Sequence, residues 1–243
     1  MTSILLIIAA IIFVALMAFF IVNKLPAKLK PLISVALWAV IIFLGYKIYS
    51  SIMEPINFNS EKKVRYAKVI DNLKIIRDAE LAYGEVNRSF TSDKQGLVSF
   101  IDTAQFAITE VKNVVVTEQR GRITVDVEKR VVDTIGFEPV KKSFEGRDYK
   151  NMFNVPGTDK QFELNTGVIE KVQGVKTSVF EAKVKKSEVL TGMSQHLINQ
   201  EEEALGGINV PGEYISVGSL NEVNSNGNWP PFYDSKKENS DTE

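Results

Sequence analysis

The sequence contains no cysteine and a single histidine, His196, among its 243 residues. Without cysteine the chain has no disulfides, no thiol nucleophile and no zinc site built from cysteine and histidine clusters. A single histidine that lies beside the apolar stripe of a predicted helix also gives little support for a proton-transfer site. The folded part is therefore expected to be stable from packing alone.

Glycine-rich phosphate cradles and an excess of one charge are also missing. Gly206-Gly207, Gly212 and Gly218 fit neither a dinucleotide nor a P-loop spacing. The 29 basic and 30 acidic residues nearly balance, whereas nucleic-acid binding needs a clear basic excess. We therefore predict a protein that is not an enzyme, carries no organic cofactor and has no nucleic-acid partner.

Two long apolar runs near the N-terminus contain almost no charge. Residues 4–22 contain no charged or polar side chain, and residues 31–49 contain only Ser34 and Lys47 as clear interruptions. A helix of this length is about 28 Å long, which matches a hydrocarbon core of roughly 30 Å. The pattern predicts a transmembrane helical hairpin within residues 1–55.

The short turn between the two runs sets the expected orientation. Residues 23–30 carry three lysines, which the positive-inside rule assigns to the cytoplasm. The domain that follows would then lie outside the cytoplasm, and its lack of cysteine fits a bacterial envelope better than an animal-type secreted module. We expect a bacterial inner-membrane protein with a periplasmic C-terminal domain.

A second helix is predicted directly after the membrane segment. Pro55 should end or kink the membrane helix, and Asn59 or Ser60 can cap a new helix that ends near residues 84–87. Its apolar side chains recur at three- and four-residue spacing, which indicates an amphipathic helix with one face to bury. These positions are Tyr66, Val69, Ile70, Leu73, Ile76, Ala79, Tyr83 and Val86.

The rest of residues 56–234 mixes short helices with strands. Residues 113–117 and 122–127 are rich in β-branched side chains and flank Arg120-Gly121, a candidate hairpin turn. Further strands are expected at 161–164, 167–172, 179–184 and 214–217, and helices at 96–102 and 187–205. The predicted fold class is α+β: the long amphipathic helix packed on a small, mostly antiparallel sheet. Residues 235–243 have no apolar side chain and should be a disordered polar tail.

The C-terminal loop offers two candidate sites. Oxygen-bearing side chains alternate before Gly227, as in a calcium loop, and the candidate metal ligands are Glu222, Asn224, Asn226 and Asp234. The same residues also fit a plain Asn-Gly turn. An aromatic patch follows, made of Trp229, Phe232 and Tyr233. It would pack on the domain or bind a partner.

Two segments carry a resemblance to a known group of proteins. The helix through Ile76-Arg77-Asp78-Ala79-Glu80-Leu81-Ala82-Tyr83, then Phe90-Thr91-Ser92-Asp93 and Leu97, resembles the region after the transmembrane helix of type IV pilin-like and type II secretion pseudopilin-like proteins. It falls within residues 64–101. The stretch 218–229 is similar to the polar, sometimes calcium-binding end loop of that group. The basic leader before a phenylalanine-started helix is missing here, and two apolar runs replace one.

Three hypotheses about function follow. The first is a membrane-anchored, non-enzymatic structural or assembly subunit of a bacterial envelope complex, of secretion, pilus-like or motility type, contacting other envelope proteins or further copies of itself. The second is a periplasmic sensor or ligand-binding module that depends on calcium. The third is a hydrolase using a carboxylate pair drawn from Asp93, Asp102, Glu118 and Asp126.

Overall fold

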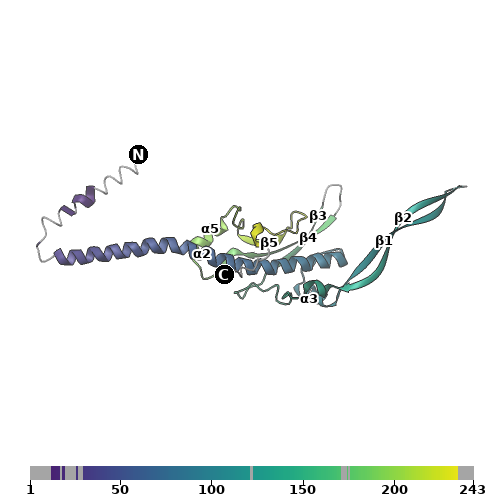
Figure 1. Ribbon diagram of the computed structural model, residues 1–243, viewed down its shortest axis with the longest axis horizontal. Coiled ribbons are helices and arrows are strands. Elements are labelled where there is room, and N and C mark those ends of the chain that lie inside the picture. Colours follow the sequence, from purple (N-terminus) through teal and green to yellow (C-terminus); the bar gives the residue numbers. More distant parts are fainter. Residues whose placement is uncertain are drawn as a thin grey trace, which may run out of the picture. The chain divides into compact units, whose positions relative to one another are not determined.

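A computed structural model describes residues 12–16, 18–19, 26, 30–120, 123–170, 174 and 176–234 (Figure 1). The fold is α+β, as predicted, with a long helix near the N-terminus and two small antiparallel sheets. The chain divides into two compact units, residues 1–57 and 58–243. All of the sheet structure belongs to the second unit.

Helix α2 (Lys30–Asn87) contains the predicted second apolar run. It is the one helix within the described ranges that is long and apolar enough to cross a membrane, and none of its most apolar window is buried. Leu32, Trp38 and Tyr49, for example, are all more than 60% exposed. Most of residues 4–22 and of the turn at 23–30 lies outside the described residues, so a two-helix hairpin is not shown.

The expected helix end at Pro55 is wrong, because α2 continues through this proline without a break. A proline inside a helix removes one backbone hydrogen bond and crowds the carbonyl four residues earlier. This penalty is confined to one turn. The helix on the C-terminal side is held by packing that starts immediately, at Phe58, and this local support outweighs the cost at Pro55.

The part of α2 after residue 57 buries the predicted amphipathic stripe. Six of the predicted positions are at most 1% exposed, whereas Tyr83 is partly buried and Val86 is 42% exposed. Lys62 lies four residues before Tyr66 and seven before Val69, on the same face of the helix. It is buried there although it is charged, which corrects the expectation that charged side chains lie only on the opposite face. The six buried positions are Tyr66, Val69, Ile70, Leu73, Ile76 and Ala79.

After α2, a short helix leads into a long two-stranded ribbon. Helix α3 (Lys94–Thr103) is capped by Asp93, whose side chain accepts the Gln95 N–H. Strands β1 (Gln105–Arg120) and β2 (Ile123–Pro139) then pair with each other antiparallel, and no other described strand joins them. The hairpin was predicted, but its strands are far longer than residues 113–117 and 122–127.

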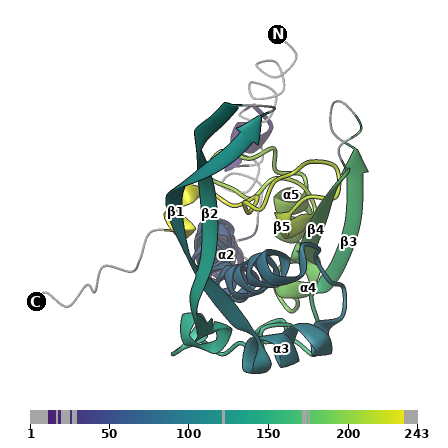
Figure 2. The same ribbon diagram turned by 90° about the vertical axis from the view of Figure 1, so that its right-hand side faces the viewer.

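The second sheet has three strands in the order β3-β4-β5 (Figure 2). They are β3 (Glu163–Glu170), β4 (Lys176–Lys185) and β5 (Tyr214–Gly218), all antiparallel. The predicted strand at 161–164 starts later, because Gln161 forms only an isolated bridge to Asn154. Side chains from this sheet and from α2 share one hydrophobic core. The single sheet predicted from the sequence is therefore two separate sheets in the structure.

The predicted helix over 187–205 is two short helices, α4 (Lys186–Val189) and α5 (Gln195–Glu202). Gly192 lies between them with a φ of +87°, a left-handed conformation that cannot be part of a right-handed helix. Two 3₁₀ turns, Val140–Phe144 and Pro231–Tyr233, complete the second unit. The predicted tail at 235–243 lies outside the described residues.

Candidate functional site

The β1–β2 ribbon is the most unusual surface of the second unit. Val140 N–H donates to the Ala104 carbonyl at 3.0 Å and closes its base beside α3. Among the ribbon side chains that the structure describes, none beyond Phe106 belongs to or packs against the hydrophobic core. A two-stranded ribbon has only its own hydrogen bonds for support and is marginally stable alone.

Large apolar side chains are exposed along this ribbon. Phe137 is 66% exposed, and Val115 and Val132 are each 58% exposed. The register puts Val111 beside Val132 on one face, while Val114 and Val116 lie on the other. Exposed apolar groups in such number are typical of surfaces that bind another molecule. The ribbon residues of this kind are Ile108, Val111, Val114, Val115, Val116, Val131, Val132, Ile135 and Phe137.

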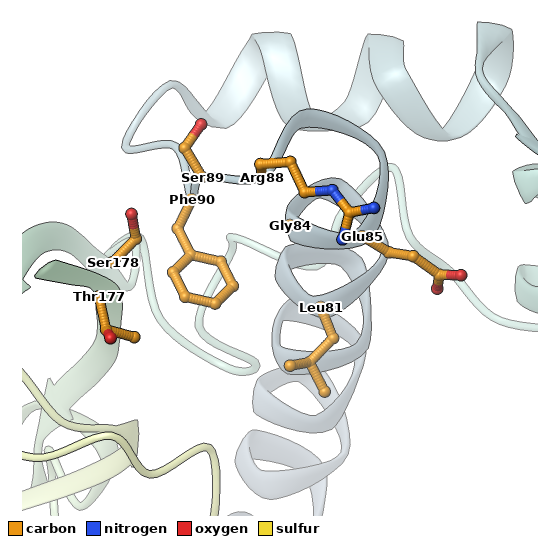
Figure 3. A pocket seen from close by; sticks show the side chains of 8 residues that line it. All are labelled: Leu81, Gly84, Glu85, Arg88, Ser89, Phe90, Thr177 and Ser178. Atoms are coloured by element: carbon orange, nitrogen blue, oxygen red, sulfur yellow. The ribbon is translucent and has the colours of Figure 1, made fainter. Parts of the chain in front are cut away.

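A groove lies at the C-terminal end of α2, between the helix and β4 (Figure 3). Its first part has a volume of about 340 Å³ and is lined by Leu81, Gly84, Phe90 and the hydroxyl side chains Thr177 and Ser178, among others. An adjoining part of about 200 Å³ extends along β4 to the loop at 223–225. The groove is mainly apolar with a hydroxyl rim.

The β4 segment beside this groove has a free edge. Residues 176–180 pair with β3, whereas β5 pairs only with residues 181–185. Within the part of the chain that the structure describes, no strand covers the second edge of 176–180. The groove can therefore accept an elongated ligand that hydrogen-bonds to backbone.

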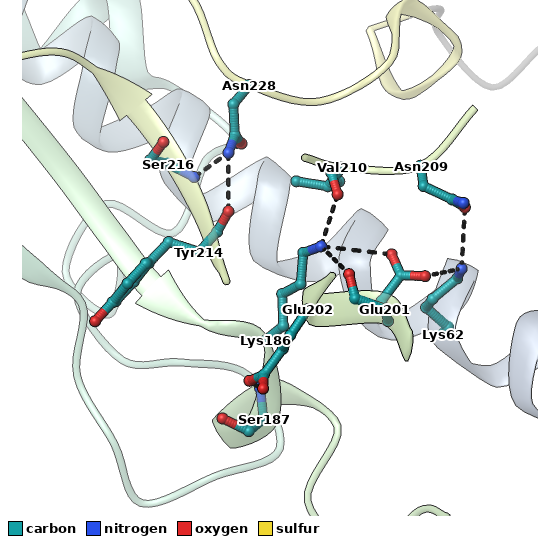
Figure 4. Close-up of polar contacts among 10 residues, drawn as sticks. All are labelled: Lys62, Lys186, Ser187, Glu201, Glu202, Asn209, Val210, Tyr214, Ser216 and Asn228. Carbon is teal, nitrogen blue, oxygen red and sulfur yellow. Dashed lines mark hydrogen bonds and ion pairs between the residues drawn. The ribbon is translucent and has the colours of Figure 1, made fainter. Parts of the chain in front are cut away.

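A buried cluster of charges lies between α2, α4 and α5 (Figure 4). Lys62 Nζ lies 2.7 Å from Glu201 Oε2, and both side chains are almost fully buried. Lys186 Nζ donates to the carbonyls of Glu201 and Val210 at 2.5 and 2.6 Å. Burial lowers the pKa of Lys186. The ion pair of Lys62 with Glu201 connects α5 to α2. The hydrogen bonds of Lys186 hold the end of α5 and the loop that follows it.

Glu80 is a second buried acid, and it lies on α2. Its Oε2 accepts the Thr91 N–H at 3.1 Å, and its Oε1 has no hydrogen-bond partner. Burial raises the pKa of Glu80 to about 7, and the hydrogen bond from Thr91 opposes part of this rise. Glu80 thus fixes the loop after α2 and titrates near neutral pH.

The predicted metal ligands lie in two separate parts of the C-terminal segment. Asn224 Oδ1 accepts the Asn226 N–H at 2.8 Å, and the Asn224 N–H donates to the Glu222 carbonyl, so these residues form a turn. Asp234 Oδ1 instead lies 3.0 Å from Lys74 Nζ and accepts the Trp229 indole N–H. Among the described residues, no group of three or more His, Asp or Glu side chains could hold a metal ion. The calcium loop stays a prediction.

The aromatic patch is split between core and surface. Trp229 is 7% exposed and belongs to the hydrophobic core, while Tyr233 packs against it. Phe232 is 47% exposed and stacks at a tilt on Tyr233. Of the three predicted partner-binding residues, Phe232 therefore has the largest exposed fraction.

The other residues singled out from the sequence are spread over separate elements. His196 is exposed on α5, not half-buried as its position beside an apolar stripe suggested. Asp93 caps α3, Asp102 accepts the Tyr149 hydroxyl at 2.7 Å, and Asp126 accepts the Thr117 hydroxyl at 2.7 Å. Each of these three carboxylates has a local structural contact.

Sequence reasoning missed the groove and the exposure of the ribbon. The groove joins Leu81 and Phe90 to Thr177 and Ser178, which no local pattern connects. The ribbon could have been suspected from charged residues on both of its faces, since Glu110 and Lys112 lie on one face and Glu128 and Arg130 on the other. No protein-family model, curated protein or solved structure matches the chain.

Proposed function

We propose that the protein is a membrane-anchored, non-enzymatic structural or assembly subunit of a bacterial cell-envelope complex, of secretion, pilus-like or motility type. The observation that carries this proposal is the β1–β2 ribbon, whose apolar side chains are exposed along both faces. A ribbon of about 16 residues per strand spans roughly 50 Å. It gives the subunit a long contact surface, of which no described side chain beyond Phe106 contributes to the core.

The anchor supports the same proposal. The exposed apolar part of α2 is suited to lipid, and the helix then continues into the packed domain. We propose that residues 4–22 and 31–49 form a helical hairpin in the bacterial inner membrane, with the domain from residue 56 in the periplasm. The resemblance of residues 64–101 to pilin-like and pseudopilin-like proteins favours an assembly role within that compartment.

Site-specific photo-crosslinking in living cells tests the proposed function. A photoreactive residue in place of Val132, which is 58% exposed on the ribbon, is expected to trap an envelope protein or a second copy of the chain. Ile208 is 82% exposed outside the ribbon and is the matched control position. Equal crosslinking at both positions, or none at Val132, would contradict the proposal.

A second candidate is a ligand-binding or sensory module, and the groove beside β4 favours it. The groove combines an apolar interior, a hydroxyl rim and an unpaired strand edge at residues 176–180. A calcium-dependent version uses the loop of Glu222, Asn224 and Asn226. Thermal unfolding with millimolar calcium and with chelator tests it, since a bound ion raises the midpoint. An unchanged midpoint excludes the calcium version.

A further inference from the structure

We infer that two copies of the chain pair through the free edge of β1, in an antiparallel register that puts Val111 opposite Val111 of the second copy. This inference rests on the proposed function, because it names the partner of the same ribbon. The argument uses the free edges of the ribbon, the charges along β1 and the apolar residues beside them.

Of the two edges, β1 is the one suited to pairing. Ile108 faces Gly136 and Thr109 faces Thr134, so Ile135 is an extra residue that bulges out of β2. Strand β2 also contains Gly136 and ends in Pro139, which has no N–H to donate. Bulges and prolines protect a strand edge against pairing. Strand β1 has neither glycine nor proline over Gln105–Arg120.

A second copy fits this edge by symmetry. Most oligomers have a two-fold axis, and an antiparallel pair of identical strands has one that passes between the two copies of one residue. With the axis at Val111, Glu110 of each copy faces Lys112 of the other. Within one copy these two side chains already lie 2.8 Å apart. The pair of copies would then carry four alternating charges across one face.

Neighbouring registers are unfavourable. An axis at Glu110 would put two acids face to face, and an axis at Lys112 would do the same with two amines. Like charges directly opposite each other destabilise a sheet. An axis at Asn113 would put Glu110 opposite Val116, which leaves the acid facing an apolar side chain. Of these four axis positions, only Val111 gives attraction between the charges.

The same register pairs the apolar residues. Ile108 faces Val114 of the second copy, and Phe106 faces Val116. Ile108 and Val114 are each 43% exposed in the single chain, so the pairing would cover them. Two strands matched over residues 105–117 make about 12 main-chain hydrogen bonds. An ordinary protein interface has roughly ten hydrogen bonds in total.

Cysteine crosslinking of the full-length protein in membranes and in detergent tests the register. The chain contains no cysteine, so each engineered thiol is unique. Val111→Cys is expected to form a disulfide-linked dimer on mild oxidation, because facing residues in a sheet lie within disulfide range. Val115→Cys is the control: it is more exposed, at 58% against 45%, but would face Ala107. Mixing Ala107→Cys with Val115→Cys copies should restore crosslinking.

Charge exchange is the second test. Glu110→Lys or Lys112→Glu alone would create two like-charge pairs and should weaken the dimer about tenfold. The double variant Glu110→Lys/Lys112→Glu exchanges the charges in both copies and should restore the crosslinked fraction at Val111→Cys. Unchanged far-ultraviolet circular dichroism in each variant would show that folding is intact.

The outcomes separate this inference from the proposed function. Crosslinking at Val115→Cys but not at Val111→Cys would overturn the pairing, and so would a double charge variant that stays as weak as the single ones. If Val111→Cys gives no dimer while the photoreactive residue at Val132 traps a different envelope protein, the inference is wrong and the proposed function stands. If neither position gives a product, both fail.

Discussion

At the scale of single residues, Glu80 makes the stability of the C-terminal end of α2 depend on pH. Its pKa is raised from an ordinary 4.5 to about 7 by burial, so the folded protein keeps the proton that the unfolded chain loses. Stability from this group is fully present below pH 4.5 and is lost as pH rises through about 7. The loss amounts to roughly 3 kcal/mol.

Replacement of Glu80 by Gln should remove this dependence. The Gln carbonyl can still accept the Thr91 N–H, and the side chain cannot ionise. We expect the unfolding free energy of Glu80→Gln, relative to the natural protein, to increase between pH 5 and pH 8. Denaturant unfolding at a series of pH values measures it. Glu85→Gln, at an exposed position one residue from the end of the same stripe, is the control and should show no such trend.

Glu201 is the residue on which the buried charge cluster depends. It faces Lys62 at 2.7 Å and Lys186 at 3.8 Å, so its removal would leave two buried cations without a counter-charge. We predict that Glu201→Ala lowers the unfolding free energy by about 3–5 kcal/mol. Thermal or denaturant unfolding of the full chain measures the loss.

Glu203 supplies a matched control for Glu201, because it is an exposed acid two positions along the chain. Glu203→Ala should change stability by less than about 0.5 kcal/mol. The double variant Lys62→Met/Glu201→Met replaces the ion pair by apolar side chains and should lose less than Glu201→Ala alone. Equal losses in Glu201→Ala and Glu203→Ala would contradict a structural role for the cluster.

At the scale of elements, the ribbon and the core are separate. No residue from 110 to 133 belongs to the described hydrophobic core, and the ribbon is closed at its base by Ala104 and Val140. Replacing residues 110–133 by an Asn-Gly turn that joins Thr109 to Thr134 should therefore change the unfolding free energy by less than about 1 kcal/mol. The thermal midpoint measures this. A large fall would mean that the ribbon stabilises its own domain and isn't only a contact surface.

The elements also show what sequence patterns can predict. The amphipathic stripe of α2 was predictable because Val69, Ile70 and Leu73 repeat at helical spacing. The split between α4 and α5 was not, because Leu190 and Met193 continue the apolar pattern across Gly192. The left-handed φ of Gly192, in the turn between the two helices, cannot belong to a right-handed helix, and the hydrophobic period does not show it.

The candidate site was harder to predict than the fold. A run such as Val114-Val115-Val116 is typical of a strand buried on both faces, yet all three side chains are more than a third exposed. Burial depends on which other elements cover a strand, and this is a long-range property of the chain. The groove is of the same kind, because it exists only where the end of α2 meets β4.

At the scale of the whole molecule, the exposed apolar part of α2 is compatible with membrane anchoring. The most apolar window of this helix has a mean hydropathy of 2.0 and none of it is buried. In water this surface would be unfavourable by roughly 25 cal/mol for each Å² of apolar area. In a bilayer the same side chains face lipid, and the backbone polar groups are already satisfied within the helix.

Protease protection then determines on which side the second unit lies. With the lysine-bearing turn at residues 23–30 in the cytoplasm, the domain after residue 55 should be resistant in intact cells and cut once the outer membrane is permeabilised. In inverted inner-membrane vesicles it should be protected. Immunodetection of a C-terminal tag follows the fragments, and a cytoplasmic protein of the same cells reports any leakage.

The opposite pattern has a definite meaning. Cleavage in inverted vesicles together with resistance in permeabilised cells would put the ribbon in the cytoplasm, because the second unit would then follow a span that enters from the periplasm. Lys62, Lys63, Arg65 and Lys68 follow the apolar segment in sequence, and they would then act as the cytoplasmic positive charges. The partners of the ribbon would have to be cytoplasmic, and the periplasmic role proposed for the subunit would be wrong.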